Sequence, residues 1–310
     1  MQAVLNAAVP IFALILVGFL CGRLGAFARE ATDSINRFAV YLALPALIFT
    51  TMARITPAEI GQFGFATGFA GGIAVTFALA FWLARRRGGS MADASIEGLD
   101  AGYSNVGFMG IPLCLLVFGP DGLPAAVIAT LFTACVLFLT AIVLVELDLR
   151  RGAGRLGAMR RVAVSLLRNP LFLAPIAGLG VGLTGLPLPL PLETAAKLLG
   201  GAASPCALIC IGLFLAQESA LAGNARQIGL LVVLKLLFQP AVTALFVFGL
   251  FDMPPLWARA AVLLSALPIG SGPFTIAKLY GLQTGVTSGA ILISHLVSVL
   301  TVSALVAWLG

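Results

Sequence analysis

The sequence predicts an all-α integral membrane protein with ten transmembrane helices, arranged as two inverted five-helix repeats with broken crossing helices 4 and 9. Three observations support this: an apolar composition, ten apolar runs, and a recurrence of prolines and glycines along the chain. Of the 310 residues, 60% are hydrophobic and 10% are charged, and the mean hydropathy is +1.10. A water-soluble core does not need so much apolar surface, so the composition excludes a soluble globular protein.

The apolar runs are each long enough to cross a bilayer, which takes about 20 helical residues. They extend over residues 3–21, 35–52, 63–84, 99–118, 123–147, 171–186, 195–216, 228–251, 256–279 and 286–309. Arg23 is the first basic residue and follows the first run. We therefore expect an uncleaved first span rather than a signal peptide.

Most basic residues fall in alternate loops between these runs. Fourteen of the 18 lysines and arginines do so: Arg23, Arg29, Arg37, Arg85, Arg86, Arg87, Arg150, Arg151, Arg155, Arg160, Arg161, Arg168, Arg226 and Lys278. The opposite loops hold Arg54, Lys197 and Arg259. Because cytoplasmic loops carry the excess of basic residues, we expect a multi-pass protein with both termini outside the cytoplasm. The net charge of +6 then indicates contact with membrane lipid, and we expect no nucleic acid partner.

Prolines and glycines recur at a fixed distance. Pro10, Gly18, Gly22, Gly25 and Pro45 return 160 residues later as Pro170, Gly178, Gly182, Gly185 and Pro205. Pro112 and Pro273 are 161 residues apart. These matches predict two repeats, residues 1–155 and 156–310. Because each repeat has five spans, an odd number, the second copy enters the membrane in the opposite orientation.

The fourth and ninth spans contain helix-breaking segments, residues 104–113 (SNVGFMGIPL) and 266–274 (ALPIGSGPF). Proline lacks an N–H group and glycine weakens a helix, so both segments leave backbone groups without partners. Hydrocarbon tolerates such groups only beside a cavity. We expect half-helices that begin at Pro112 and Pro273 to point their N-termini at one cavity, where their positive ends favour a carboxylate. The alternative is that these residues serve only helix kinks and tight packing.

The candidate substrate-binding residues come from these two segments. They are Asn105, Ser104, Gly110, Pro112, Gly270, Ser271 and Pro273. Their side chains are uncharged, and residues 103–119 and 260–277 contain no Asp, Glu, Lys or Arg. This absence disfavours a cation/proton antiporter, which would keep ionisable carboxylates at the crossing.

Two further residues inside apolar spans are candidate coupling groups or charge partners. Lys235 either reaches the membrane interface with its amine or neutralises a bound carboxylate or a cluster of carbonyl groups. His295 is the single histidine, and it either packs as a neutral, hydrogen-bonded side chain or carries a transported proton. Glu97 and Asp100 are expected at the cytoplasmic end of the fourth span, where they would cap a helix N-terminus.

The sequence offers no sign of an enzyme. It contains no HExxH motif, no paired carboxylates and no Ser/His/Asp set at one depth of the membrane. All five cysteines lie in or at the end of apolar runs, so we expect neither disulfides nor a metal site, and no cofactor. If the protein binds a carboxylate, it is either a transporter of that carboxylate or, as the alternative, a membrane sensor that binds it without transporting it.

Five segments of the chain resemble the auxin efflux carrier family, which includes plant auxin exporters and bacterial carriers of malonate and related organic acids. The segments are residues 105–113, residues 35–38 (INRF) with 44–45 (LP), residues 168–170 (RNP), residues 212–216 (GLFLA) and residues 266–280 (ALPIGSGPFTIAKLY). The resemblance implies that Asn105 matches the substrate-binding asparagine of the family, and that Pro112 and Pro273 match its crossover prolines. Residues 63–84 lack the Asp and Lys that the plant carriers have in this span.

The resemblance also implies a mechanism and a location. It implies a secondary active or facilitative transporter of small organic anions in the bacterial inner membrane, working by elevator-like alternating access. A scaffold domain would comprise residues 1–60 and 165–222, and a transport domain residues 61–150 and 226–310. The scaffold would form a homodimer through spans 1, 2, 6 and 7.

Overall fold

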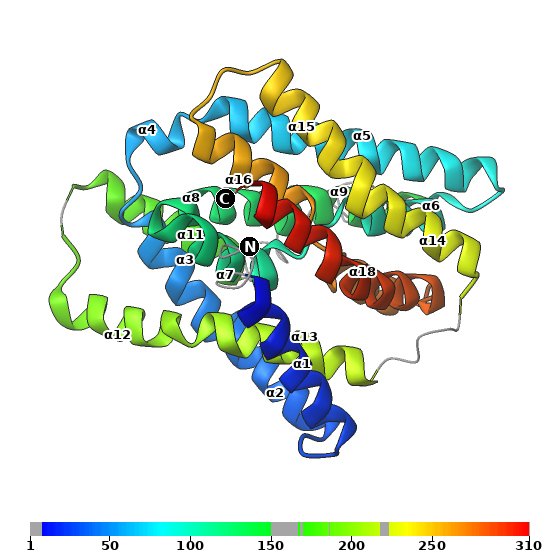
Figure 1. Ribbon diagram of the computed structural model, residues 1–310, viewed down its shortest axis with the longest axis horizontal. Helices are drawn as coiled ribbons and strands as arrows, with labels where there is room; N and C mark the ends of the chain where they lie inside the picture. The colour runs from blue at the N-terminus through cyan, green and yellow to red at the C-terminus, as the bar shows by residue number, and fades with distance from the viewer. Residues whose placement is uncertain (1–7, 150–166, 168–169, 186, 218–222, 310) are drawn as a thin grey trace.

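The computed structural model describes residues 8–149, 167, 170–185, 187–217 and 223–309, which form helices joined by short turns (Figure 1). These residues form no β-strand. Six helical runs among them are long and apolar enough to cross a membrane, and three shorter helices are also apolar. The prediction of an all-α integral membrane protein is therefore confirmed. The basic residues predicted for the central loop, 150–168, lie outside the described part of the chain.

The helices alternate with short π-helical and 3₁₀ segments, labelled η. The first half contains α1 (Val9–Arg23), α2 (Arg29–Phe38), η2 (Ala39–Ala43), α3 (Leu44–Met52), α4 (Pro57–Ile60), α5 (Phe63–Arg86), α6 (Met91–Gly102), η3 (Val106–Gly110), α7 (Ile111–Phe118), η4 (Gly119–Gly122), α8 (Leu123–Leu131), η5 (Phe132–Leu137) and α9 (Phe138–Leu149). The second half contains α11 (Pro170–Leu183), α12 (Leu190–Gly201), α13 (Ala203–Gln217), α14 (Ala225–Val233), η6 (Leu234–Phe238), α15 (Gln239–Gly249), α16 (Pro255–Ser265), α17 (Gly272–Leu279) and α18 (Gly285–Leu309).

The helix α6 begins eight residues before the predicted start of the fourth apolar run. Ser90 caps it, because the backbone N–H of Asp93 donates to the Ser90 hydroxyl oxygen at 3.0 Å. The extra residues include Glu97, and Asp100 follows within the predicted run; both are buried within the fold. Polar side chains that lowered the apparent hydropathy of this segment thus belong to the interior of the molecule. Glu97 and Asp100 lie beyond the first turn, so the expectation that they cap the helix is wrong.

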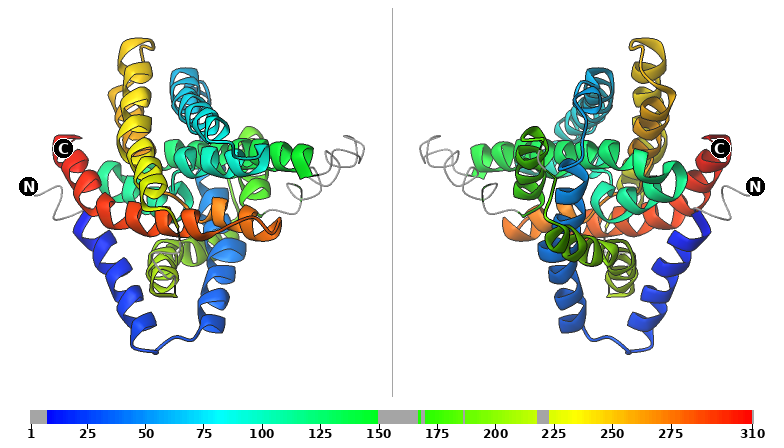
Figure 2. Two further views of the ribbon diagram at one scale, coloured as in Figure 1. Left: turned by 90° about the vertical axis from the view of Figure 1, so that its right-hand side faces the viewer. Right: turned by 90° about the vertical axis from the view of Figure 1, so that its left-hand side faces the viewer.

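The helices form two groups. In one group α1 packs along α13, and α3 packs against α11 and α12. In the other, α5 packs against α6 and α15, while α14 packs against α18. Figure 2 shows α5 and α14–α15 at the top of the molecule and α1–α3 at the bottom. Residues of α13 meet η3, and α3 meets α8, so the second group rests on the first.

The close helix contacts of the first group occur in two matching sets. A β-carbon on Gly18 would collide with the carbonyl oxygen of Ile209, and one on Gly178 would collide with that of Phe49. Both members of the second contact are shifted by 160 residues from those of the first. Gly25 and Gly185, also 160 residues apart, have positive φ angles of 74° and 67°. The recurrent glycines therefore serve the same two purposes in each half: close backbone approach and a left-handed turn.

Three π-helical segments each end two residues before a proline. The segment η2 precedes Pro45, η3 precedes Pro112 and η6 precedes Pro240. Proline cannot donate to the carbonyl four residues earlier, and its ring crowds that carbonyl. A π-helical turn shifts the hydrogen-bond pattern by one residue, so helices continue through these prolines instead of ending at them.

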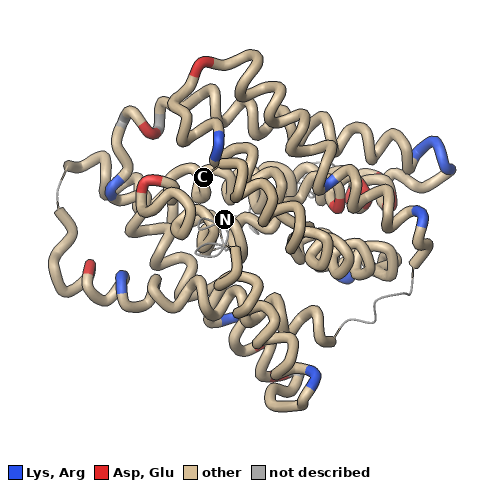
Figure 3. The backbone as a smooth tube through the Cα atoms, in the orientation of Figure 1, with Lys and Arg blue, Asp and Glu red and all other residues tan. Residues whose placement is uncertain are grey.

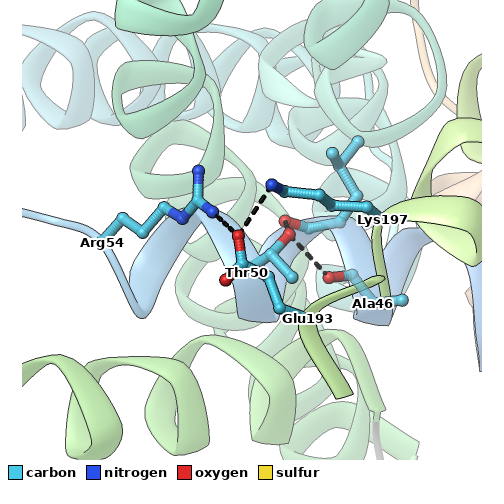
Figure 4. Close-up of polar contacts among 6 residues, drawn as sticks. Ala46, Thr50, Arg54, Glu193 and Lys197 are labelled. Atoms are coloured by element: carbon cyan, nitrogen blue, oxygen red, sulfur yellow. Dashed lines mark hydrogen bonds and ion pairs between the residues drawn. The ribbon is translucent and has the colours of Figure 1, made fainter. Parts of the chain in front are cut away.

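Charged residues lie mainly at helix ends and in turns, with long uncharged stretches between them (Figure 3). Arg54, after α3, and Lys197 of α12 both contact the carboxylate of Glu193, Lys197 at 2.7 Å (Figure 4). These two basic residues were predicted to lie in loops on the same side of the membrane. Their shared carboxylate places them together at one edge of the first helix group.

We expect Gly178→Ala to lower the free energy of unfolding by about 1–3 kcal/mol, because the new methyl group overpacks the contact with Phe49. Thermal unfolding of the purified protein in detergent would measure this. Gly180 lies on the same helix and has nothing within 4 Å of an added β-carbon. Gly180→Ala is thus the matched control and should leave the melting temperature unchanged or slightly raised. Equal melting temperatures for the two variants would contradict the close packing of α11 on α3.

Candidate functional site

The two predicted breaks are present and lie against each other. Helix α6 ends at Gly102 and helix α16 ends at Ser265, and each is followed by an extended segment. Ser104 and Ile269 form an antiparallel bridge between these segments. The N–H of Asn105 donates to the Pro268 carbonyl at 2.9 Å, and the N–H of Gly270 donates to the Tyr103 carbonyl at 3.0 Å. Backbone groups freed by the breaks thus satisfy one another.

The place where residues 103–105 and 268–270 pair is called the crossing. Two positions at the crossing have room only for glycine. A β-carbon on Gly270 would lie 2.8 Å from the ring of Tyr103, and one on Gly272 would lie 2.6 Å from it. The Tyr103 ring therefore fills the space that two side chains would otherwise occupy. Ser294 of α18 fixes the crossing from a third side, because its hydroxyl oxygen accepts from the Ile269 N–H at 3.1 Å.

The two half-helices after the breaks do not start where the prolines predict. Helix α17 begins at Gly272, with Pro273 in its first turn as expected. The other helical segment begins at Val106, six residues before Pro112. The prediction that Pro112 starts a half-helix is therefore wrong. The π-helical segment η3 accommodates this proline inside a continuing helix, and Asn105 occupies the N-cap position instead.

The C-terminal ends of α6 and α16 face polar side chains of a third helical run. The Lys235 amine donates to the carbonyl of Ser265 at 2.6 Å, and the Gln239 amide donates to the carbonyl of Gly102 at 3.2 Å. Both side chains are 0% exposed. Lys235 therefore does not reach the membrane interface, and its amine bonds one helix-end carbonyl where the alternative expected a bound carboxylate or a cluster of carbonyl groups. A cation at a helix C-terminus is stabilised by the negative end of the helix dipole.

The N-terminal ends of the other two half-helices open onto a cavity of about 450 Å³. Asn105 and Phe108 line it from η3 and its N-cap, and Ser271 and Phe274 line it from α17. The first amides of a helix have no acceptor within that helix. At the crossing, the N-termini of η3 and α17 therefore lie at the cavity, whereas the C-termini of α6 and α16 contact Gln239 and Lys235.

Asn105 and His295 meet in the wall of this cavity. The Asn105 side-chain nitrogen lies 3.3 Å from Nε2 of His295, and Nδ1 of His295 lies 2.9 Å from the Ile291 carbonyl oxygen. A carbonyl only accepts, so we assign the proton to Nδ1, and Nε2 accepts from the Asn105 amide. The exposed fractions of Asn105 and His295 are 7% and 5%. The bond to His295 uses one N–H of the Asn105 amide, and the second N–H can donate to a ligand.

Three of the predicted residues line the cavity: Asn105, Ser271 and His295. The other predicted residues lie elsewhere and shape the crossing. They are Ser104 and Gly270 in the paired segments, Gly110 against Leu264 and Leu267, Pro112 in α7, Pro273 in α17, and Lys235 in η6, whose amine contacts the last residue of α16.

The cavity also has lining residues that the sequence analysis did not place there. Thr32, Asp33 and Asn36 contribute from α2, and Lys278 contributes from the last turn of α17. The helix α2 has the sequence REATDSINRF. A polar helix next to an apolar run is the pattern that could have indicated polar side chains facing a cavity. Lys278 was counted only as a loop charge. Both charged residues, Asp33 and Lys278, are exposed and mark the open end of the cavity.

Comparison with known proteins gives matches along nearly the whole chain. A family model described as "Membrane transport protein" matches residues 3–306. The chain is 33% identical to a "Putative malonate transporter" of Rhizobium meliloti (strain 1021), over 98% of this chain and 95% of the relative. It is 25% identical to "Auxin efflux carrier component 5" of Arabidopsis thaliana, over 95% and 93% of the two chains. It is 24% identical to "Uncharacterized transporter YfdV" of Escherichia coli (strain K12), over 94% and 93%.

We expect Lys235→Met to lower the free energy of unfolding by about 1–3 kcal/mol, because it leaves the buried carbonyl of Ser265 without its donor. Thermal unfolding in detergent would again be the measurement. The control is Lys197→Met, whose side chain is 57% exposed in an ion pair and whose loss costs at most about 1 kcal/mol. A Lys235→Met variant as stable as the wild type would show that the helix end does not depend on this amine.

Proposed function

Because this chain belongs to the membrane transport protein family, which includes the auxin efflux carriers, we propose that it is a secondary active or facilitative transporter of small organic carboxylates. The named relatives are transporters and not enzymes. The observation that carries the proposal is the cavity at the crossing, where two helix N-termini and neutral polar side chains converge.

An anion is the ligand that this arrangement favours. The N-termini of η3 and α17 lie beside the cavity, and the positive ends of their helix dipoles attract an anion. The Asn105 amide and the Ser271 hydroxyl supply hydrogen bonds without a fixed charge. A ligand held by dipoles and neutral groups can also be released, which a transporter requires and a tight ion pair would hinder.

The apolar part of the cavity limits the cargo to a small molecule with a hydrocarbon portion. Phe108, Phe214 and Phe274 line it, and the rings of Phe214 and Phe274 meet edge to face with centroids 5.8 Å apart. A volume of about 450 Å³ suits one small ligand. The relative from Rhizobium meliloti carries the name "Putative malonate transporter", so malonate is the first cargo to test.

We further propose ten spans in two inverted repeats, a division that the matching contacts of Gly18 and Gly178 support. The helix group of α1–α3 and α11–α13 would be the scaffold, residues 1–60 and 165–222. The group that contains the crossing would be the transport domain, residues 61–150 and 226–310. In this proposal the transport domain moves against the scaffold in an elevator-like manner, and the scaffold forms a homodimer through spans 1, 2, 6 and 7.

The proposed location is the bacterial inner membrane, with both termini outside the cytoplasm. The basic residues of alternate loops favour this orientation. In the same orientation Arg54 and Lys197, which share Glu193, lie on the outer side. The cavity then opens toward the cytoplasm, because Asp33 and Lys278 lie at the end of the cavity that faces the basic loops.

We expect Asn105→Ala to abolish binding of malonate to the purified protein while the melting temperature stays near that of the wild type. The contacts of Asn105 that hold the crossing together come from its backbone, so removal of the side-chain amide spares them. Binding measured by calorimetry and counterflow of radiolabelled malonate in liposomes would provide the two readouts.

Ser104→Ala is the matched control, because Ser104 is a neighbouring polar residue that does not line the cavity. It should bind and transport as the wild type does. Malonate binding retained by Asn105→Ala would refute the assignment of the site. Binding by the wild type without counterflow would instead favour the sensor.

A further inference from the structure

A second cavity, of about 380 Å³, lies beside α6. The end of α5, the helix α6, the first residues of α14 and the first turn of α18 enclose it. Asp100 projects into it from α6, five residues before Asn105, and is 0% exposed. One carboxylate oxygen of Asp100 accepts from the Thr287 hydroxyl at 2.9 Å. The other, Oδ1, has no hydrogen-bond partner in the described part of the chain.

The other charged groups of this cavity are already engaged or exposed. Arg87 forms an ion pair with Glu97, and the Gln227 amide donates to the same carboxylate at 2.7 Å. Asp93 is exposed at the N-terminus of α6. The remaining polar lining residue, Gln283, is uncharged. Asp100 is thus a buried carboxyl group that has no cationic partner among the described residues around this cavity.

Ionisation of a buried carboxyl group raises the free energy of the protein when one of its oxygens has no hydrogen-bond partner. A bound cation removes this cost. A metal ion such as sodium needs several converging oxygen ligands. Here Oδ1 of Asp100 is the uncommitted carboxylate oxygen, and the neighbouring carboxylate of Glu97 is held by Arg87 and Gln227. Among the described residues, no group of three His, Cys, Asp or Glu side chains could hold a metal ion. A single proton needs only this one oxygen. The geometry therefore suits a proton better than a metal ion.

The Asp100 cavity and the cargo cavity share the helix α18, and Asn105 follows shortly after the end of α6. Asp100 bonds Thr287 of α18, and Asn105 lies beside His295 of the same helix. Asp100 and Asn105 are five residues apart, and Thr287 and His295 are eight residues apart. A change of charge at Asp100 therefore acts on the helix that positions the histidine in the cargo site.

We propose that Asp100 is the site of a transported proton, which binds at Oδ1 and crosses the membrane together with the carboxylate cargo. This inference rests on the proposed transport function and adds its coupling ion. A proton from one side adds to the carboxylate to give a neutral carboxyl group, and it leaves on the other side to regenerate the carboxylate. Each proton offsets one negative charge of the cargo.

The test uses Asp100→Asn, which keeps the size and the bond from Thr287 but cannot exchange a proton. In liposomes with equal pH on both sides, malonate counterflow by this variant should persist. Accumulation of malonate driven by a proton gradient, acidic outside, should fall to the level of protein-free liposomes. Asp93→Asn, which removes an exposed carboxylate of the same cavity, should retain both activities.

Failure of this inference differs from failure of the proposed function. Absence of counterflow in the wild type would refute carboxylate transport. Gradient-driven accumulation by Asp100→Asn, or wild-type accumulation that follows a sodium gradient instead, would refute the proton site. Infrared spectroscopy tests the site without any cargo, because the carbonyl band of a protonated carboxyl group should be present in the wild type and absent from Asp100→Asn. A band unchanged by the substitution would also refute it.

Thr287→Val provides a second variant with an independent readout. The Thr287 hydroxyl donates to Asp100 and stabilises its ionised form, so its loss should favour the protonated form. The pH dependence of gradient-driven uptake should then move to higher pH. A lower rate with an unmoved pH profile would mean that Thr287 has only a structural role, and would contradict the inference.

Discussion

The structure depends on the backbone pairing of two interrupted helices at the crossing. A membrane interior offers no water to a free N–H or carbonyl group, so a break in a spanning helix needs partners from the protein itself. Here residues 103–105 and 268–270 supply one another through hydrogen bonds of 2.9 and 3.0 Å. This pairing fixes the positions of four helix ends, and all polar features of the proposed mechanism are arranged around those ends.

The two halves of the chain supply similar backbones but different chemistry. Glycines recur in matching helix contacts and matching turns, so the repeat determines the geometry. The functional side chains do not recur. Asp100 lies on α6, whereas the corresponding stretch of α16, residues 260–264 (AAVLL), is wholly apolar. Lys235 and Gln239 likewise cap both half-helices from a single helical run. A duplicated scaffold can thus hold one cargo site and one cation site without duplicating either.

Sequence reasoning located the two breaks, placed Asn105 and Ser271 at the cavity and singled out His295 within a span, because proline, glycine and isolated polar residues in apolar runs are visible in the sequence. It misplaced the start of one half-helix, since a π-helical turn that lets the helix continue through Pro112 leaves no such mark. It also missed Asp100. In the sequence, a carboxylate near the end of an apolar run resembles a helix cap, and only the three-dimensional structure shows that Asp100 is buried.

The charges of Lys235 and Asp100 explain why the proposed transport domain would carry both an anion and a proton. With Lys235 protonated and Asp100 ionised, these two buried groups have no net charge. A monovalent carboxylate that joins them makes the set negative, and inward movement of one negative charge against an inside-negative potential costs about 2.3 kcal/mol per 100 mV. A proton on Asp100 restores neutrality, so the membrane potential no longer opposes entry of the cargo. In the proposed cycle the carboxyl group near the cargo therefore decides whether uptake works against the membrane potential or independently of it.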